Sequence, residues 1–220
     1  MLIAGVDDAG RGPVIGPLVI TGVLFEEAEL HKLIEIGVKD SKLLSSKKRE
    51  TLASQIKAMA LIHHTVWLSP AEIDRVVESK RKFHKLNRLE AQAMAKAITI
   101  LKPDIVYVDA SDVLADRFAE HIAESLTFSP KIVSEHKADV KYPIVSAASI
   151  IAKVERDKAI CQLQKKHGNI GCGYPSDPNT IKFLETWIRK FGSYPNFVRK
   201  SWKTAKRVKS KTDSLQKKLQ

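Results

Sequence analysis

The chain has 220 residues, 44% hydrophobic and 28% charged, which is the composition of a globular protein with one sizeable core and excludes a disordered chain, a collagen and a coiled coil. Its longest apolar stretch, residues 14–25, is too short for a transmembrane helix, and acidic residues follow Leu2 too closely for a secretory signal, so we expect a cytoplasmic protein without membrane contact. The formal net charge is +12, of which +8 lies between Arg199 and Gln220, and this excess indicates a polyanionic partner.

Three strands are predicted in the first third of the chain. Apolar runs predict strands over Leu2–Val6 and Val14–Phe25, and the turn residues 10–13 between them predict a hairpin-like connection. Apolar residues at helical spacing after Ser46 predict a helix, and a third strand follows over Leu61–Leu68.

Helices alternate with two further strands in the rest of the chain. Ser69 and Asn87 each begin a helix, because each is a capping residue followed three positions later by glutamate. Short apolar runs predict strands over Ile105–Val108 and Lys131–Ser134. Further helices are predicted over Leu114–Leu126, Pro143 to about Lys166, and Pro178–Phe191. This order predicts an α/β protein with a five-stranded sheet of mixed direction, flanked by helices and followed by a helical C-terminal extension.

No repeat or linker divides the chain, so we expect a single domain over residues 1–208. Within it, a catalytic α/β core covers about residues 1–160 and a helical part about residues 161–208. Residues 209–220 are expected to form a basic, disordered tail that contacts phosphates, with a merely solvated tail as the alternative.

Acidic residues follow three of the predicted strands. Asp7 and Asp8 come directly after the first strand, Asp109 after the fourth and Asp139 shortly after the fifth. If these strands are parallel, their carboxyl ends meet at one edge of the sheet, where the sites of open α/β sheets lie. Taken singly, each acid can instead be a helix cap or a turn residue. In a regular strand, Asp7 and Asp8 point to opposite faces, so either the backbone turns between them or one of them does not bind a metal directly.

Four carboxylates that lie close together repel one another unless cations separate them. Oxygen ligands favour Mg²⁺ or Mn²⁺, and neither the two cysteines nor the seven histidines show the spacing of a zinc site. With a basic protein around them, the predicted chemistry is phosphodiester hydrolysis assisted by two metal ions, one activating water and one stabilising the leaving oxygen.

The glycine-rich segment Gly10-Arg11-Gly12 follows the first acidic pair. Glycine permits backbone conformations and close approach to a ligand that other residues forbid, so these backbone groups are candidates for contact with a nucleic-acid sugar. A plain glycine turn is the alternative. A dinucleotide-binding fingerprint fits poorly, because Gly16 stands one position too late.

Six short segments resemble type 2 ribonuclease H of the archaeal type, the ribonuclease HII family, and they occur in that family's order over about residues 2–207. The resemblance implies a ribonuclease H-like fold and a divalent-metal endonuclease that cleaves the RNA strand of RNA/DNA hybrids. It also implies incision on the 5′ side of a single ribonucleotide in duplex DNA, leaving 3′-hydroxyl and 5′-phosphate ends. The segments are residues 5–13, 40–42, 107–110, 135–139, 146–150 and 173–177.

By this resemblance, Asp7, Asp109 and Asp139 correspond to metal-binding catalytic carboxylates. Asp8 is included in the same catalytic and metal-binding set, but the family usually has glutamate there, which is longer by one methylene group. We expect adjustment of the backbone at Ala9 and Gly10 to restore the metal contact, so that the enzyme is active. The alternative is a catalytically weakened homologue that binds nucleic acid.

The resemblance also implies a set of substrate-binding residues. Gly10, Arg11 and Gly12 correspond to the loop that senses the ribose 2′-hydroxyl, which distinguishes RNA from DNA. Tyr174 corresponds to the tyrosine that packs against the sugar following the ribonucleotide, and Lys42 to a phosphate contact. The alternatives are an ordinary tyrosine of a glycine-proline turn and a solvated lysine.

Other readings of the chain fit less well. An aspartyl phosphatase needs its acids two positions apart, whereas Asp7 and Asp8 are adjacent, and a transposase or integrase has no use for the glycine loop. Gln216 and Leu219 resemble the start of a sliding-clamp-binding box, but the aromatic pair of such boxes is absent, so we expect no clamp binding. The expected partners are RNA/DNA hybrids and ribonucleotide-containing duplex DNA, bound by a monomer.

Overall fold

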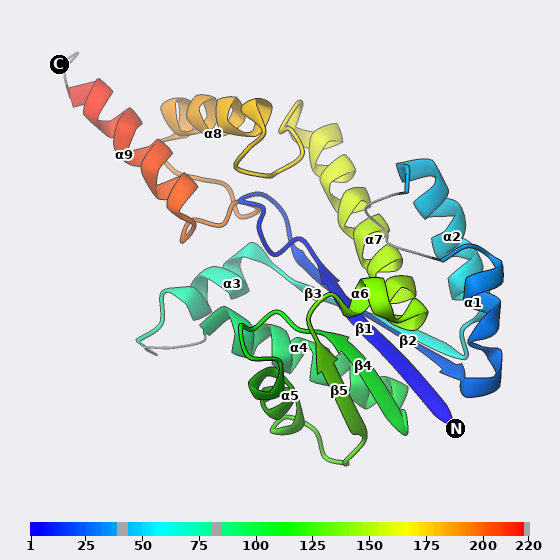
Figure 1. Cartoon of the computed structure of the whole chain (residues 1–220). Coiled ribbons are helices and arrows are strands. Elements are labelled where there is room, and N and C mark those ends of the chain that lie inside the picture. The colour runs from blue at the N-terminus through cyan, green and yellow to red at the C-terminus, as the bar shows by residue number, and fades with distance from the viewer. Residues whose placement is uncertain (39–43, 81–84, 218–220) are drawn as a thin grey trace. The chain divides into compact units, whose positions relative to one another are not determined.

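The computed structural model describes residues 1–38, 44–80 and 85–217 (Figure 1). Five strands form one sheet in the order β3-β2-β1-β4-β5. β1 runs antiparallel to β2 and parallel to β4, which is parallel to β5, so the predicted mixed sheet is confirmed. The strands are β1 (Leu2–Ala9), β2 (Leu18–Glu26), β3 (Ile62–Leu68), β4 (Ile105–Asp109) and β5 (Lys131–Glu135).

Most of the helices lie where the sequence predicts them. Ser69 closes a capping box with Glu72 at the start of α3, and the side chain of Asp177 accepts a hydrogen bond from the Asn179 amide at the start of α8. The short helices η1, α1 and α6 were not predicted. The helices are η1 (Glu27–Glu29, a 3₁₀ helix), α1 (His31–Glu35), α2 (Ser46–Met59), α3 (Pro70–Val77), α4 (Lys85–Leu101), α5 (Ala115–Ala123), α6 (Ala138–Lys141), α7 (Pro143–His167), α8 (Pro178–Phe191) and α9 (Lys203–Lys217).

The chain divides into two compact units, each built from segments that are separate in the sequence. The first unit comprises Met1–Ala9, Val19–Trp67 and Lys82–Glu155. The second comprises Gly10–Leu18, Leu68–Arg81 and Arg156–Gln220. Two early segments therefore belong with the C-terminal helices, which no division of the sequence at one position can express.

In the first unit, helices cover both faces of the sheet. Ile3 and Phe25 belong to a buried cluster with residues of α1, α2 and the first part of α7. On the opposite face, a side chain at Gly22 would collide with Leu101 of α4, 2.7 Å away. Gly5 similarly leaves no room for a side chain, because the backbone of α7 at Ile144 lies against it. This close approach brings α7 alongside the strand that carries Asp7.

Two segments of the second unit differ from the prediction. β2 begins at Leu18 rather than Val14, because Gly16 has a φ of +92° and Ile15 pairs in an isolated bridge with Val198. The helix α9 continues to Lys217 where a disordered tail was expected from Lys209. It is held by apolar side chains of the second unit's core, which includes Val14, Ile15, Ile160, Ile170, Leu184, Ile188, Phe197, Val198, Ala205 and Val208.

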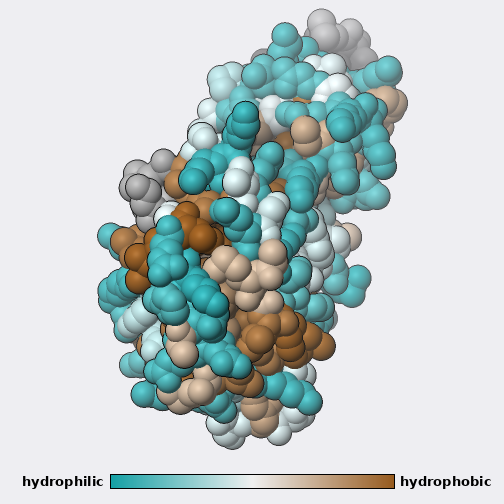
Figure 2. All heavy atoms as spheres, turned by 90° about the vertical axis from the view of Figure 1, so that its right-hand side faces the viewer, coloured by the Kyte–Doolittle hydropathy of each residue, from teal (hydrophilic) through white to brown (hydrophobic). Residues whose placement is uncertain are grey.

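Hydrophilic residues predominate on the face of the molecule shown in Figure 2, with smaller hydrophobic areas between them. Among the helices of residues 1–38, 44–80 and 85–217, none combines the length and the apolar character needed to cross a membrane.

Candidate active site

The three acid-bearing strands have their carboxyl ends at one edge of the sheet, as predicted. Parallel pairing aligns Val6 with Val108, and Asp109 with Glu135. Asp7 and Asp8 stand near the end of β1, and Asp109 is the last residue of β4. All of these residues belong to the first unit.

Asp7 is the most strongly perturbed of these acids. Its side chain is buried, with 4% of the residue exposed. Burial raises the pKa of Asp7 well above its ordinary value, and the nearby negative charges of Asp8 and Asp109 raise it further. The three carboxylates therefore lie close enough to interact, and a cation between them would relieve both the repulsion and the cost of burial.

Two residues of α7 support the charged form of Asp7. Ser149 is fully buried and hydrogen-bonded to the Asp7 carboxylate, and the positive charge of Lys153 also lowers the Asp7 pKa. The Lys153 Nζ donates to the Ser149 Oγ at 2.9 Å. The two side chains are four residues apart and thus share one face of the helix. That spacing was visible in the sequence, but no site role was predicted for either residue.

Asp8 remains in the extended strand, so the backbone does not turn between the two acids. The strand pairing continues through Asp8, opposite Ile20, to Ala9. The Asp8 side chain is half-buried, and its Oδ1 accepts a hydrogen bond of 3.2 Å from the Ser111 Oγ. Its backbone N–H donates to the Asp7 Oδ1 at 2.7 Å. Of the two possibilities raised by the sequence, a turn of the backbone between Asp7 and Asp8 is therefore not observed.

Ser111 is held in place by its neighbour in the sequence, the buried Asp112, which binds two side chains of nearby helices. The carboxylate of Asp112 accepts hydrogen bonds from the Asn87 Nδ2, at 2.8 Å, and from the guanidinium of Arg117. Burial opposes ionisation of Asp112, but these hydrogen bonds outweigh it and hold its pKa well below the ordinary value. The loop after β4 is thereby tied to α4 and α5, and Ser111 is kept beside Asp8. Ser111 was not predicted as a site residue, although it stands only two residues after Asp109.

Asp109 and Asp139 are brought together through the start of α6. The Asp109 Oδ1 accepts a hydrogen bond of 2.8 Å from the backbone N–H of Ala138, the residue before Asp139. Lys137 adopts the left-handed conformation, with a φ of +58°, to turn the chain into this helix. Asp139 is buried in the first turn of the helix. The carboxylate that follows β4 thus binds the start of the helix that carries Asp139.

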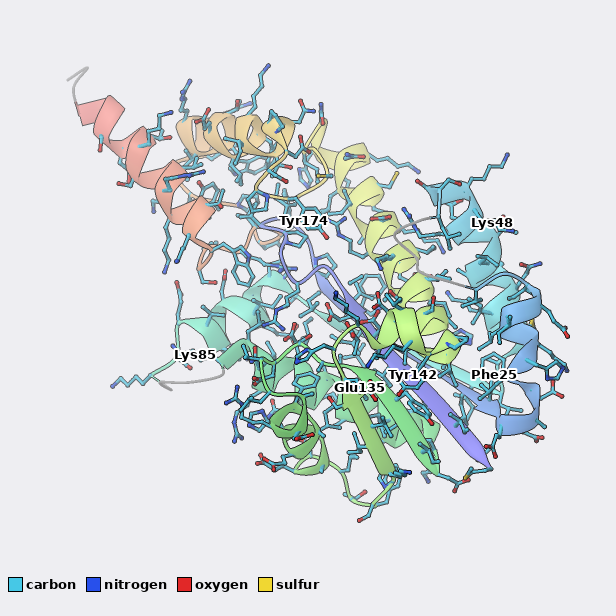
Figure 3. All side chains as sticks on the ribbon, in the orientation of Figure 1. Phe25, Lys48, Lys85, Glu135, Tyr142 and Tyr174 are labelled. Carbon is cyan, nitrogen blue, oxygen red and sulfur yellow. The ribbon has the colours of Figure 1, made fainter. Side chains whose placement is uncertain are left out.

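The position of α6 is fixed by contacts of Lys141, its last residue, and of Tyr142, which directly follows it. The Tyr142 hydroxyl donates to the Glu135 Oε1 at 2.8 Å, and these two side chains lie next to each other in Figure 3. The rings of Tyr142 and Tyr107 are 4.4 Å apart between centroids, and Lys141 forms an ion pair with Glu135. These contacts attach the short helix to β4 and β5, and so they determine where Asp139 lies.

The predicted ribose-sensing residues gather in the second unit. Gly10 has a φ of +94°, and an added β-carbon would lie 2.7 Å from the Pro17 carbonyl oxygen. An added β-carbon at Gly12 would lie 3.6 Å from the ring of Tyr174, which is 39% exposed. The guanidinium carbon of Arg156 lies over that ring, 4.9 Å from its centroid. The loop and Tyr174 therefore form one surface, whereas Lys42 lies outside the described residues.

The donor chemistry of the acidic cluster fits a hard divalent cation. Its candidate ligands are carboxylate oxygens, which Mg²⁺ and Mn²⁺ prefer, and burial together with the charges of Asp8 and Asp109 raises the pKa of Asp7, a cost that a bound cation would offset. Within the described part of the chain, no three histidine, cysteine or acidic side chains already surround one point at which an ion could be held.

Comparison with known proteins identifies the family. The family model of ribonuclease HII matches residues 4–205. Ribonuclease HII of Thermococcus sibiricus is 49% identical over 213 residues, which cover 96% of this chain and 92% of that protein.

Two solved structures of archaeal relatives have the same fold. The crystal structure of ribonuclease H2 from Pyrococcus horikoshii has a TM-score of 0.89 at 44% identity, covering 97% of this chain and 99% of that one. The ribonuclease HII chain of a PCNA complex from Archaeoglobus fulgidus has a TM-score of 0.83 at 42% identity, covering 94% and 96%. The chain therefore belongs to the ribonuclease HII family, and it is an endoribonuclease of ribonuclease H-like fold that cleaves the RNA of RNA/DNA hybrids.

Proposed function

We propose that this endonuclease depends on divalent metal ions and that it also incises duplex DNA on the 5′ side of a single embedded ribonucleotide. The products would carry a 3′-hydroxyl and a 5′-phosphate. The observation that carries the proposal is the set of acids at the carboxyl edge of the parallel strands, where Asp8 and Asp109 raise the pKa of the buried Asp7. Such crowding is costly in a metal-free protein and becomes favourable when cations are bound.

The proposed metal ligands are Asp7, Asp8, Asp109 and Asp139, with Mg²⁺ or Mn²⁺ as the ion and two ions when substrate is bound. When bound, these ions supply charge stabilisation at the scissile phosphate and lower the pKa of the attacking water. The hydrogen bond from Ser149 favours the charged form of Asp7 and orients its carboxylate, while the Ala138 amide orients Asp109. Asp8, which is short and held by Ser111, contacts an ion directly or through a water molecule.

Recognition of the ribonucleotide is assigned to the surface formed by Gly10, Arg11, Gly12 and Tyr174. Gly12 is exposed and carries no side chain, so a sugar can approach the backbone there. The half-exposed ring of Tyr174 offers an apolar face to the next sugar. A 2′-hydroxyl is both donor and acceptor, and backbone groups of this loop can therefore distinguish ribose from deoxyribose. Lys42 remains the proposed phosphate contact.

The basic C-terminal segment is proposed to contribute affinity for the phosphate backbone. Lys203, Lys206 and Lys209 lie on α9, and their charges attract a polyanion in a salt-dependent way. The relative from Archaeoglobus fulgidus was solved as a complex with PCNA. We propose no clamp contact for this chain, because its last residues lack the aromatic pair of a clamp-binding box. We propose that the enzyme acts as a monomer.

The decisive experiment uses a labelled DNA duplex that contains one ribonucleotide. We expect incision on its 5′ side with Mg²⁺ or Mn²⁺, none with EDTA, and a 3′ end that a DNA polymerase extends directly. The Asp139→Asn variant should lose this activity, while Asp116→Asn, which changes an exposed aspartate of α5, should keep it. Cleavage that persists in EDTA, or that leaves a cyclic 2′,3′-phosphate, would mean that the ribose hydroxyl rather than a metal-activated water attacks.

A further inference from the structure

We propose that Arg199 and Trp202 are positioning residues for ribose recognition, because they turn the carbonyl groups of residues 10–12 inward and so direct backbone N–H groups of this loop toward the sugar. The inference rests on the proposed function of the loop. It assigns a role to two residues that stand more than 180 positions from the loop in sequence. All of the residues concerned belong to the second unit.

Arg199 is the largest fully buried side chain among the described residues. Burial of a guanidinium is costly unless its N–H groups find acceptors. Its Nη2 donates to the Gly10 carbonyl at 2.6 Å, its Nη1 to the Arg11 carbonyl at 2.8 Å and its Nε to the Gly16 carbonyl at 3.1 Å. One rigid guanidinium thus binds two carbonyl oxygens of the glycine loop and a third from Gly16, which follows the loop.

Trp202 completes this arrangement. Its indole Nε1 donates to the Gly12 carbonyl at 3.2 Å, and its ring lies 4.9 Å from the guanidinium carbon of Arg199. The backbone N–H of Arg199 in turn donates to the Val14 carbonyl at 2.9 Å. The three carbonyls of residues 10–12 are therefore all bound by side chains, those of Gly10 and Arg11 by the buried Arg199 and that of Gly12 by Trp202.

The direction of these carbonyls determines the direction of the neighbouring amides. In a planar trans peptide, the C=O of one residue and the N–H of the next point in opposite directions. Because the Gly10 and Arg11 carbonyls converge on Arg199, the N–H groups of Arg11 and Gly12 point away from it. Gly12 is exposed, and its N–H has no acceptor among the described residues. It is a donor held ready for an oxygen of the ligand.

The guanidinium is suited to this role in a way that an ammonium is not. Arg199 uses donors at three fixed positions of a planar fork, whereas lysine offers one compact charge on a flexible chain. Arg199→Lys keeps the positive charge but cannot hold all three carbonyls. Trp202→Phe keeps a smaller aromatic ring beside Arg199 and removes the N–H that binds the Gly12 carbonyl.

The test measures binding preference rather than activity alone. Fluorescence anisotropy with Ca²⁺ would give the Kd for a duplex with one ribonucleotide and for the same duplex made only of DNA, and the ratio of the two is the ribose preference. We expect Trp202→Phe and Arg199→Lys each to reduce this ratio about tenfold, because each variant loses hydrogen bonding to the loop carbonyls. The affinity for the all-DNA duplex should be unchanged. The matched controls are Trp187→Phe and Arg189→Lys on α8, which should keep the preference.

The binding measurements distinguish failure of the proposed loop function from failure of the positioning role. A wild-type protein that does not prefer the ribonucleotide refutes the proposed function of the loop, and the positioning role with it. A wild-type preference that survives unchanged in a folded Trp202→Phe variant overturns the positioning role while the proposed function stands. If Arg199→Lys fails to fold, Trp202→Phe decides alone, because phenylalanine retains an aromatic ring at this partly buried position.

Discussion

Alanine substitutions at Gly10 and Gly12 distinguish the part that the glycine loop plays in stability from the part that it plays in catalysis. At Gly10, alanine would have to adopt a φ of +94°, and its β-carbon would lie 2.7 Å from the Pro17 carbonyl oxygen and 3.3 Å from the Arg156 Cγ. The left-handed conformation costs about 1–2 kcal/mol, and overpacking against fixed neighbours adds about 1–3 kcal/mol. Gly10→Ala should therefore lower the free energy of unfolding by about 2–5 kcal/mol.

Gly192 provides the matched control for this magnitude. It ends α8 with a φ of +70°, but an added β-carbon meets no atom within 4 Å. Gly192→Ala should cost only the conformational part, about 1–2 kcal/mol. Urea unfolding of the variants measures the difference. Equal destabilisation of Gly10→Ala and Gly192→Ala would refute the reasoning, since the contact with Pro17 would then have no energetic consequence.

At Gly12, in contrast, alanine should affect catalysis rather than stability. An alanine β-carbon there would make an ordinary contact with Tyr174, at 3.6 Å, so stability should change by less than about 0.5 kcal/mol. The same methyl group would occupy the exposed surface that the sugar must approach, and a misplacement of about 1 Å can cost about a hundredfold in rate. We expect kcat/KM for a single-ribonucleotide duplex to fall by about 10- to 100-fold. Full activity in a stable Gly12→Ala protein would show that the sugar does not approach this residue.

Three further predictions concern the acids. The parent enzyme should be active, and Asp8→Glu should alter its relative rates with Mg²⁺ and Mn²⁺; an inactive parent with an active variant would show that the native Asp8 site is defective. Ser149→Ala should weaken Mn²⁺ binding about 10- to 100-fold, as measured by calorimetry, because it removes the hydrogen bond that orients Asp7. Because burial and its neighbours raise the Asp7 pKa, the unfolding temperature of metal-free protein should fall as pH rises through that value; Mg²⁺ should cancel the fall, and Asp7→Asn should lack it.

The expected pH dependence of stability has its origin in the raised pKa of Asp7. A carboxyl group whose pKa is higher in the folded than in the unfolded state binds its proton more tightly when folded, so its stabilising contribution is complete at low pH. That contribution disappears as pH rises and the buried Asp7 carboxylate becomes charged. Thermal unfolding at several pH values, with and without Mg²⁺, checks both parts. A metal-free unfolding temperature that rises with pH, with no such component lost in Asp7→Asn, would contradict the assignment.

The sequence by itself determined the regular elements and the residue types of the site. Apolar periodicity and capping residues such as Ser69 and Asp177 act through neighbours a few positions away, so α3, α8 and the five strands could be predicted. The placement of acids after three strands predicted a common edge, and the observed parallel pairing of β1, β4 and β5 confirmed its premise. The family's motifs added the roles that spacing alone leaves open.

Only the tertiary structure decided which distant side chains hold these groups in place. Ser111 beside Asp8, Ser149 beside Asp7 and Arg199 against the glycine loop are contacts between residues 103 to 189 positions apart. Local periodicity carries no information about such pairs. The helix α9 shows the same limit, because its basic sequence resembles a solvated tail until the core around Val208 gives its apolar side a surface to pack against. Burial against a partner distant in sequence, rather than local propensity, stabilises these features.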